Sequence, residues 1–158
     1  MSKPAVVPFE TTLLVRDACL CLHVQRAARA LARRFDDALR PVGLTHGQFS
    51  LMMSLNRPVP PRKGDIASLL AMDHSTLTAN LKPLERRGLI ESEVDPEDRR
   101  GRLLRLTADG MAVLARAVPV WERAHAATEA LLADGDAGRL RSDLVALSES
   151  ESDKINHR

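Results

Sequence analysis

The chain has 158 residues, a length that fits one domain or one domain with helical extensions. Hydrophobic residues make up 44% and charged residues 28% of it, a composition that excludes wholesale disorder. One Trp, three Phe and no Tyr are too few aromatic side chains for an RNA-binding sheet that stacks bases. The formal net charge of +2 does not demand a nucleic-acid partner, so any such partner must be argued from where the charges lie.

Cysteine usage and the N-terminal segment bear on the compartment. Cys19 and Cys21 are too few and too close in sequence for a disulfide scaffold, which favours a reducing environment. The sequence contains no apolar run long enough to span a membrane and no signal-peptide pattern at its N-terminus. We therefore expect a cytoplasmic protein without a membrane partner.

An arm and one long helix are predicted at the N-terminal end of the chain. Residues 1–9 are expected to form a flexible arm. From about residue 10 to residue 40, apolar side chains recur at spacings of three and four, which predicts one long helix ended by Pro41 and Gly43. The predicted stripe consists of Leu20, Val24, Ala27, Leu31, Phe35 and Ala38.

Three short helices and a hairpin are predicted next. The helices fall at about 46–56, 63–71 and 74–87, with Thr45 and Asp73 as N-caps. Pro83 lies inside the third helix and predicts a local kink. After this helix the apolar period changes, and residues 89–94 and 103–106 read as two strands joined by a charged turn.

A long helix is predicted at about 108–133, with Thr107 as its N-cap and a kink at Pro119. A last helix follows at about 137–148. The face formed by Leu114, Val118 and Trp121 is too large to bury against a small module, which favours packing against a second copy.

This order of elements is the layout of a winged helix-turn-helix, a DNA-binding module. The predicted fold class is therefore mainly α with a small β-hairpin wing, flanked by N- and C-terminal dimerisation helices. The expected divisions are a flexible arm at 1–9, the first dimerisation helix at 10–43, the DNA-binding winged module at 44–107, the C-terminal dimerisation helices at 108–148 and a frayed tail at 149–158.

DNA contacts are expected from two places in the module. Small hydroxyls at the start of the third short helix suit the major groove, and a lysine one turn later suits a phosphate. Arginines on the hairpin tip suit the electronegative minor groove, and Asp98 would hold the Arg100 side chain by a charge-assisted hydrogen bond. Taken singly, such hydroxyls are more often helix caps and such tips more often solvated turns. The candidate residues are Ser75, Thr76, Thr78, Lys82, Asp98, Arg99, Arg100 and Arg102.

Several runs in the chain resemble the multiple-antibiotic-resistance regulator (MarR) family. They are residues 44–49, 65–67, 75–78 and 84–90, followed by the wing signature at 95–100 and by Leu106-Thr107 and Gly110. The resemblance covers roughly residues 20–147. It implies a homodimeric transcriptional regulator, usually a repressor, that binds an inverted-repeat operator in double-stranded DNA. It also implies that Asp98 and Arg100 form the wing's Asp-x-Arg pair. The chain departs from the family at Ala79, where many members carry Arg, and at Pro83.

Members of that family respond to small aromatic or lipophilic acids, to oxidants or occasionally to zinc. A pocket for a small lipophilic or phenolic effector is expected between the first helices and the long C-terminal helix, because methionine-rich walls adapt to varied apolar ligands. The alternative is that these methionines are ordinary core residues. The candidate pocket residues are His23, His46, Phe49, Met52 and Met53.

A thiol-based oxidant sensor is the alternative mechanism. Cys21 falls at about the position of the reactive cysteine in the organic-hydroperoxide branch of the family, and Cys19 is the second candidate. The tyrosines of that branch are missing, but His23 and nearby arginines can favour a thiolate. In an intact helix, Cys19 and Cys21 point about 200° apart, so they neither bond to each other nor complete a metal site with His23. We expect no metal and no cofactor, and a structural role for the cysteines stays open.

Two other classes of protein are the alternatives to this interpretation. The sequence contains no Gly-rich phosphate loop, nucleophile elbow or His-Glu-x-x-His motif, so we expect no enzyme. A helical interaction module without DNA binding is the remaining alternative, and the modest charge and Ala79 fit it.

Overall fold

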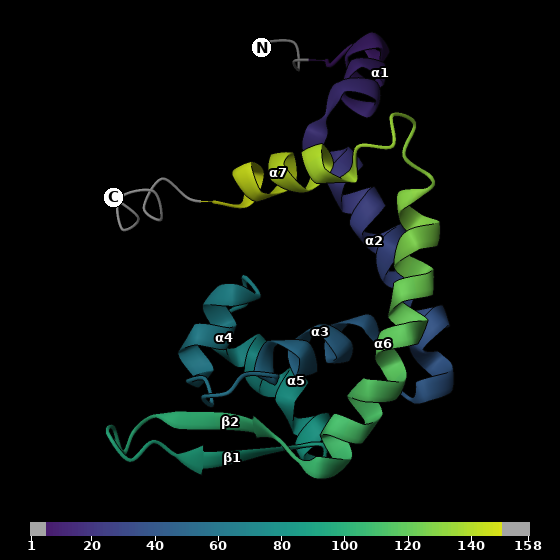
Figure 1. Ribbon diagram of the computed structural model, residues 1–158. Helices are drawn as coiled ribbons and strands as arrows, with labels where there is room; N and C mark the ends of the chain where they lie inside the picture. Colours follow the sequence, from purple (N-terminus) through teal and green to yellow (C-terminus); the bar gives the residue numbers. More distant parts are fainter. Residues whose placement is uncertain (1–5, 150–158) are drawn as a thin grey trace, which may run out of the picture.

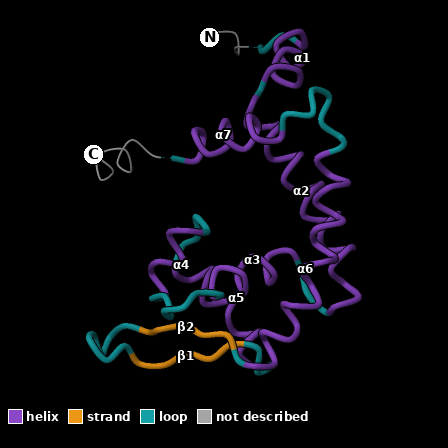
Figure 2. Tube along the Cα trace, in the orientation of Figure 1, coloured by secondary structure: helices purple, strands orange, loops and turns teal. Residues whose placement is uncertain are grey.

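The structure is a computed structural model that describes residues 6–149 (Figure 1). It is mostly helical with one two-stranded antiparallel hairpin, which confirms the predicted fold class (Figure 2). Among residues 6–149, no helix combines the length and the apolar character needed to cross a membrane. The elements in chain order are α1 (Phe9–Ala18), α2 (Leu20–Leu39), the 3-10 turn η1 (Arg40–Val42), α3 (His46–Leu55), α4 (Lys63–Leu69), α5 (His74–Arg86), β1 (Ile90–Val94), β2 (Arg102–Leu106), α6 (Ala108–Glu129) and α7 (Ala137–Ser148).

The N-caps predicted from the sequence are confirmed. Thr45 and Gln48 form a capping box, in which the Thr45 hydroxyl accepts from the Gln48 backbone N–H at 3.2 Å. Asp73 accepts from the backbone N–H of Thr76 at 2.8 Å and begins α5. Thr107 begins α6 in the same way. These caps fix where α3, α5 and α6 begin.

The prediction of one long first helix is wrong. The chain leaves helical geometry at Cys19, whose backbone is extended at φ −72° and ψ 107°, so that α1 and α2 are separate helices. The break is satisfied locally, because the Cys19 carbonyl accepts from both the backbone N–H and the ring Nδ1 of His23, the latter at 2.9 Å. No residue of α1 is buried, so no packing favours a continuous helix through this point.

Neither internal proline divides its helix. α5 continues through Pro83 to Arg86, and α6 continues through Pro119. α6 ends at Glu129, a turn earlier than predicted. α5 is therefore one continuous helix that is followed by the glycine turn at Gly88, where φ is +66°.

The hydrophobic core lies in the lower half of the molecule in Figure 1, where α3, α4, α5 and the hairpin meet the first half of α6. The end of α2 contributes Leu39 to it. The side chains with no more than 1% of their surface exposed include Leu39, Leu51, Met52, Ile66, Leu77, Leu84, Leu104 and Ala117.

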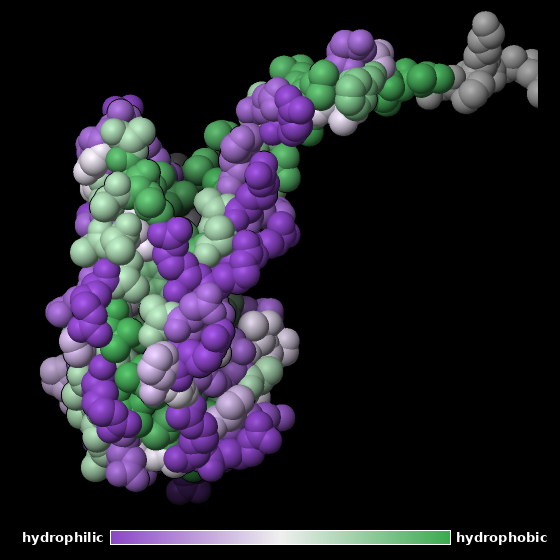
Figure 3. All heavy atoms as spheres, turned by 90° about the vertical axis from the view of Figure 1, so that its right-hand side faces the viewer, coloured by the Kyte–Doolittle hydropathy of each residue, from purple (hydrophilic) through white to green (hydrophobic). Residues whose placement is uncertain are grey.

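The upper half of the molecule leaves apolar side chains uncovered. α2 packs along α6, but α1 and α7 bury no residue. Figure 3 shows apolar atoms along this side of the molecule and out over its projecting arm. The large apolar side chains exposed by these helices include Phe9, Leu14, Leu20, Leu140, Leu144 and Leu147.

The first turn of α6 packs directly against the residues that follow α5. The backbone N–H of Thr107 donates to the Leu89 carbonyl at 3.1 Å, and the Thr107 hydroxyl donates to the Gly88 carbonyl at 2.6 Å. Gly110 is buried there, and a Cβ at this position would lie 1.9 Å from the Leu89 carbonyl oxygen. Only glycine permits so close an approach.

Candidate nucleic-acid interface and effector pocket

One side of α5 is buried in the core and the other is exposed. Leu77, Leu81 and Leu84 are buried in the core, so the opposite face is the exposed one. Lys82 is exposed on that face and forms no ion pair with any residue between 6 and 149. Of the other candidate contacts on this helix, Ser75 and Thr76 are exposed and Thr78 is half-buried.

Two of the predicted contact hydroxyls also complete the helix cap. The Ser75 hydroxyl donates to one carboxylate oxygen of Asp73 at 2.5 Å, and the Thr76 hydroxyl donates to the other at 2.7 Å. The bonds from Ser75 and then from the Thr76 backbone hold the pKa of Asp73 far below its usual range. Both hydroxyls are therefore held in place and present mainly acceptor lone pairs to the outside.

Thr78 is tied to the preceding helix. Its hydroxyl donates to the His74 carbonyl at 2.6 Å and accepts from the Lys63 ammonium group at 2.5 Å. Sequence reasoning missed Lys63, which lies 15 positions earlier at the start of α4. A basic residue at the start of the helix before the recognition helix was the available signal. Lys63 adds a positive charge at the base of the exposed α5 face.

The wing is the hairpin of β1 and β2, whose strands are joined by the loop of residues 95–101 (Figure 2). Arg99, Arg100 and Arg102 are all exposed. Asp98 accepts from the backbone N–H of Arg100 at 3.0 Å, not from its guanidinium, which corrects the expected side-chain pairing. The aspartate thus shapes the turn, as short acidic side chains do in Asx-turns, and leaves the arginine side chain free to reach outward.

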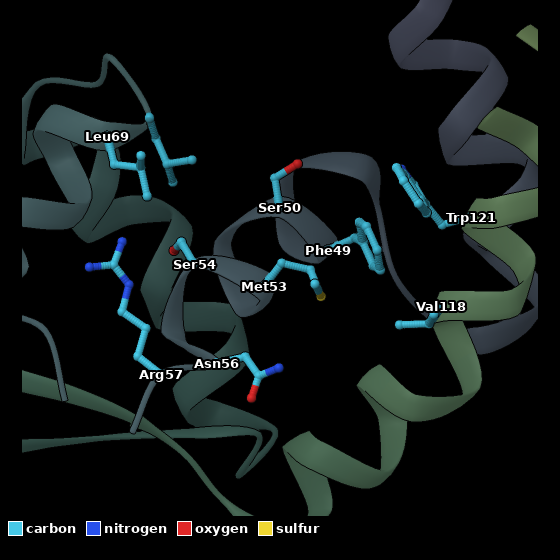
Figure 4. Close-up of a pocket in the computed structure, with 10 residues that line it drawn as sticks. Phe49, Ser50, Met53, Ser54, Asn56, Arg57, Leu69, Val118 and Trp121 are labelled. Atoms are coloured by element: carbon cyan, nitrogen blue, oxygen red, sulfur yellow. The ribbon is translucent and has the colours of Figure 1, made fainter. Parts of the chain in front are cut away.

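An apolar cavity of about 540 Å³ lies between α3, α4 and α6 (Figure 4). Phe49 and Met53 line it, as expected from the sequence. Met52 does not, because it points the other way and is fully buried in the core. The full lining consists of Phe49, Ser50, Met53, Ser54, Asn56, Arg57, Leu69, Leu70, Val118 and Trp121.

The two candidate histidines lie outside this cavity. His46 lines a smaller neighbouring cavity of about 240 Å³, and its ring Nδ1 lies 2.8 Å from Asp36. The backbone N–H and the ring of His46 lower the pKa of Asp36. His23 lies on α2 beside Arg26 and Arg33, away from Phe49, so the predicted grouping of His23 with the pocket is wrong.

An aromatic stack joins the cavity to the long helix. Trp121 of α6 stacks on Phe49 of α3 with ring centroids 6.0 Å apart, and on His125 at 4.6 Å. Trp121 was predicted as a dimer-facing residue and not as a pocket residue. Its place on the inner stripe of the long helix was the signal that could have assigned it. The cavity is therefore walled by the DNA-binding half and by α6 together.

The cysteines do not share one continuous helix. Cys19 lies in the break and Cys21 in the first turn of α2, so the expected separation of their side chains by helix rotation does not apply. Both are free thiols, and Cys21 is exposed. The Gln25 side-chain amide donates to the Cys21 sulfur at 3.1 Å.

Comparison with known proteins agrees with this geometry. The family model described as "MarR family" matches residues 44–101, from the start of α3 to the wing. The crystal structure of the M. tuberculosis transcriptional regulator MOSR in complex with DNA has a TM-score of 0.76 and 33% identity, covering 89% of this chain and 99% of that one.

Two further relatives bear on regulation. Bordetella bronchiseptica BpsR, whose DNA binding is regulated by 6-hydroxynicotinic acid, superposes with a TM-score of 0.76 at 25% identity, covering 85% of this chain and 96% of that one. The organic hydroperoxide resistance transcriptional regulator of Bacillus subtilis is 28% identical over 101 residues, 64% of this chain and 69% of its own length. These proteins are regulators of transcription and not enzymes. This chain belongs to the MarR family of transcriptional regulators.

Proposed function

We propose that the protein is a homodimeric repressor that binds an inverted-repeat operator and is released from it by a small lipophilic or phenolic acid. The observation that carries this proposal is the cavity walled by α3, α4 and α6, since a ligand there contacts both the DNA-binding half and the long helix. The regulation of BpsR by 6-hydroxynicotinic acid gives a precedent within the same fold.

Dimerisation is supported by the uncovered apolar side chains of the upper helices. Leu140 and Leu144 on α7 are each more than 40% exposed, as are Leu14 and Leu20 near the N-terminus. A second copy related by a two-fold axis would cover them. Light scattering should give twice the protomer mass, and Leu144→Glu should shift it towards the monomer. A wild-type mass equal to that of one protomer would contradict the dimer.

For DNA, the proposal places α5 in the major groove and the wing in the minor groove. Ser75, Thr76 and Thr78 would face base edges and Lys82 a phosphate, with Asp98 shaping the turn that presents Arg99, Arg100 and Arg102. Half-sites in a dimer would lie about 34–36 Å apart. Fluorescence anisotropy with duplex from upstream of the protein's own gene tests this placement. Binding no tighter than to unrelated duplex, unaffected by Arg100→Ala, would favour the interaction-module alternative.

For the effector, Trp121 provides a direct signal because it is the single tryptophan and it lines the cavity. Arg57 on the same wall suits a carboxylate, and Phe49 suits a ring. Titration with 6-hydroxynicotinic acid and with hydroxybenzoic acids should change Trp121 fluorescence and raise the Kd for DNA in parallel. Arg57→Gln should weaken the acids more than their neutral amides. Acids that neither alter the fluorescence nor release DNA would refute this effector class.

Oxidant sensing is the second candidate, favoured by the exposed Cys21 thiol beside the helix break. The similarity to the B. subtilis organic hydroperoxide resistance regulator supports it. A hydroperoxide should release DNA from wild type and added thiol should restore binding, whereas Cys21→Ser should stay bound. Cys19→Ser is the matched control. If both serine variants respond to peroxide as wild type does, the cysteines are structural.

A further inference from the structure

A charged contact joins the base of the wing to the segment that precedes α4. The Arg62 Nε donates to a carboxylate oxygen of Asp95 at 2.7 Å, and its Nη2 donates to a carboxylate oxygen of Glu97 at 3.2 Å. Arg62 is 33 positions before Asp95 in the chain, so the contact ties two segments that are distant in sequence. We call Arg62, Asp95 and Glu97 the wing anchor.

The wing anchor sits where the hairpin loop begins. β1 ends at Val94, and Asp95 follows as the first residue of the loop that carries the arginines. The other Asp95 oxygen accepts from the backbone N–H of Glu97 at 2.9 Å, and the Asp95 backbone N–H donates to Gly101 across the loop. A single aspartate thus fixes both sides of the loop and its connection to Arg62.

Burial of its carboxylate distinguishes this pair from an ordinary surface ion pair, although half of the Arg62 side chain is exposed. The Asp95 side chain is only 3% exposed, although it carries a charge. The backbone N–H of Glu97 and then the Arg62 guanidinium lower its pKa, so it is held as a carboxylate. Because a buried carboxylate needs its counter-charge, the ion pair holds the Asp95 and Arg62 side chains in one orientation relative to each other.

Backbone contacts run alongside the same junction. The Leu104 N–H donates to the Pro61 carbonyl at 3.0 Å, and Arg62 pairs with Leu103 as an isolated bridge. In Figure 1 the segment before α4 lies beside β2, while the loop projects away from the helices. The strand is therefore fixed by its backbone, and the loop beyond it is fixed by the wing anchor.

We propose that Arg62 is a positioning residue for DNA binding, which acts through Asp95 to aim the wing arginines and does not itself contact DNA. This inference rests on the proposed role of the wing. Because the bridge closes the base of the loop, its loss lets the tip carrying Arg99 and Arg100 swing, and the arginines lose their fixed approach to the groove. Arg62 spends its donors on two carboxylates, which leaves it poorly placed to neutralise a phosphate.

Asp95→Asn gives the sharpest test. The amide keeps an oxygen for the Glu97 N–H but removes the charge that holds Arg62. Deleting a negative charge near DNA should by electrostatics alone tighten binding. Positioning predicts the opposite, an increase in Kd on the order of tenfold, within the range for residues that act through a shared contact. Binding as tight as wild type or tighter would overturn the inference.

A double-mutant cycle separates positioning from direct contact. Arg62→Ala and the wing variant Arg99→Ala/Arg100→Ala are measured separately and combined by anisotropy on a duplex selected from random sequence by wild type. If Arg62 acts through the wing, adding Arg62→Ala to the wing variant changes Kd little and leaves its salt slope unchanged. If it contacts a phosphate, the losses multiply and the slope falls by about 0.9 per contact. That result would refute the inference.

Two controls complete the design. Arg105→Ala removes another wing ion pair, between β2 and Glu93, without touching the loop base, and should leave Kd nearly unchanged. Thermal unfolding of each variant shows whether a change in Kd comes from lost stability or from a wing that is no longer correctly positioned. If Arg100→Ala has no effect on Kd, the proposed role of the wing fails, whereas a strong Arg100→Ala effect with an inert Asp95→Asn refutes only the anchor.

Discussion

Replacing Gly110 by alanine should destabilise the protein, although alanine is the better helix former. In an open helical position the change would stabilise by up to about 1 kcal/mol. Here the new methyl would lie 1.9 Å from the Leu89 carbonyl oxygen and 2.9 Å from its carbon, so α6 must retreat by roughly 1.5 Å to reach normal contact. Overpacking of this kind costs about 1–3 kcal/mol, and the hydrogen bond from Thr107 to Leu89 would be weakened as well by about 1 kcal/mol.

The net expectation for Gly110→Ala is a loss of about 2 kcal/mol, which lowers the Tm by about 4–8 °C in a chain of this length. Gly47→Ala is the matched control, because Gly47 also lies in the first turn of a helix but has nothing within 4 Å of the added methyl. It should keep or slightly raise the Tm. Both are measured by circular dichroism at one protomer concentration. Equal Tm values for the two variants would refute the close approach of α6 to Leu89.

Two other predictions concern charge. Lys82→Ala should lower the slope of log Kd against log salt by about 0.9 per phosphate contact, or about 1.8 in a dimer, while the control Arg123→Ala on α6 should leave the slope unchanged. The slopes are measured by fluorescence anisotropy between about 50 and 200 mM salt. Equal slopes for wild type and Lys82→Ala would contradict a phosphate contact. Because the pKa of Asp73 is lowered on folding, its charge stabilises above about pH 4 and this contribution is lost as the pH falls. Asp73→Asn should therefore unfold in urea with a shallower pH dependence between about pH 5 and 2, and an identical dependence would exclude Asp73 as its source.

Features with local causes were predictable from the sequence. Thr45 and Asp73 are followed by the backbone groups they cap, so the starts of α3 and α5 needed no tertiary information. The wing followed from the change of apolar period on either side of a charged turn. The exposed face of α5 followed from the spacing of its leucines.

Features that depend on distant partners were not predictable. The break at Cys19 has neither glycine nor proline to mark it and depends on the absence of packing around α1. Met52 and Met53 are neighbours of equal hydropathy, and only the position of the core decides that one is buried and the other lines the cavity. The bond between Arg62 and Asp95 closes over 33 residues, a separation at which no sequence periodicity operates.

Because α6 packs so closely on Leu89, a movement of this helix is transmitted to the end of α5. Its 22 residues span about 33 Å, and its first turn is fixed to the end of the recognition helix by Thr107 and Gly110. If α6 tilts by about 5° about its C-terminal end, its first turn moves by about 3 Å, which is close to the rise of one base step in DNA. Trp121 lies about half-way along α6, so in the proposed dimer a ligand that displaces it would shift the first turn of α6, and with it the end of α5, further than Trp121 itself moves.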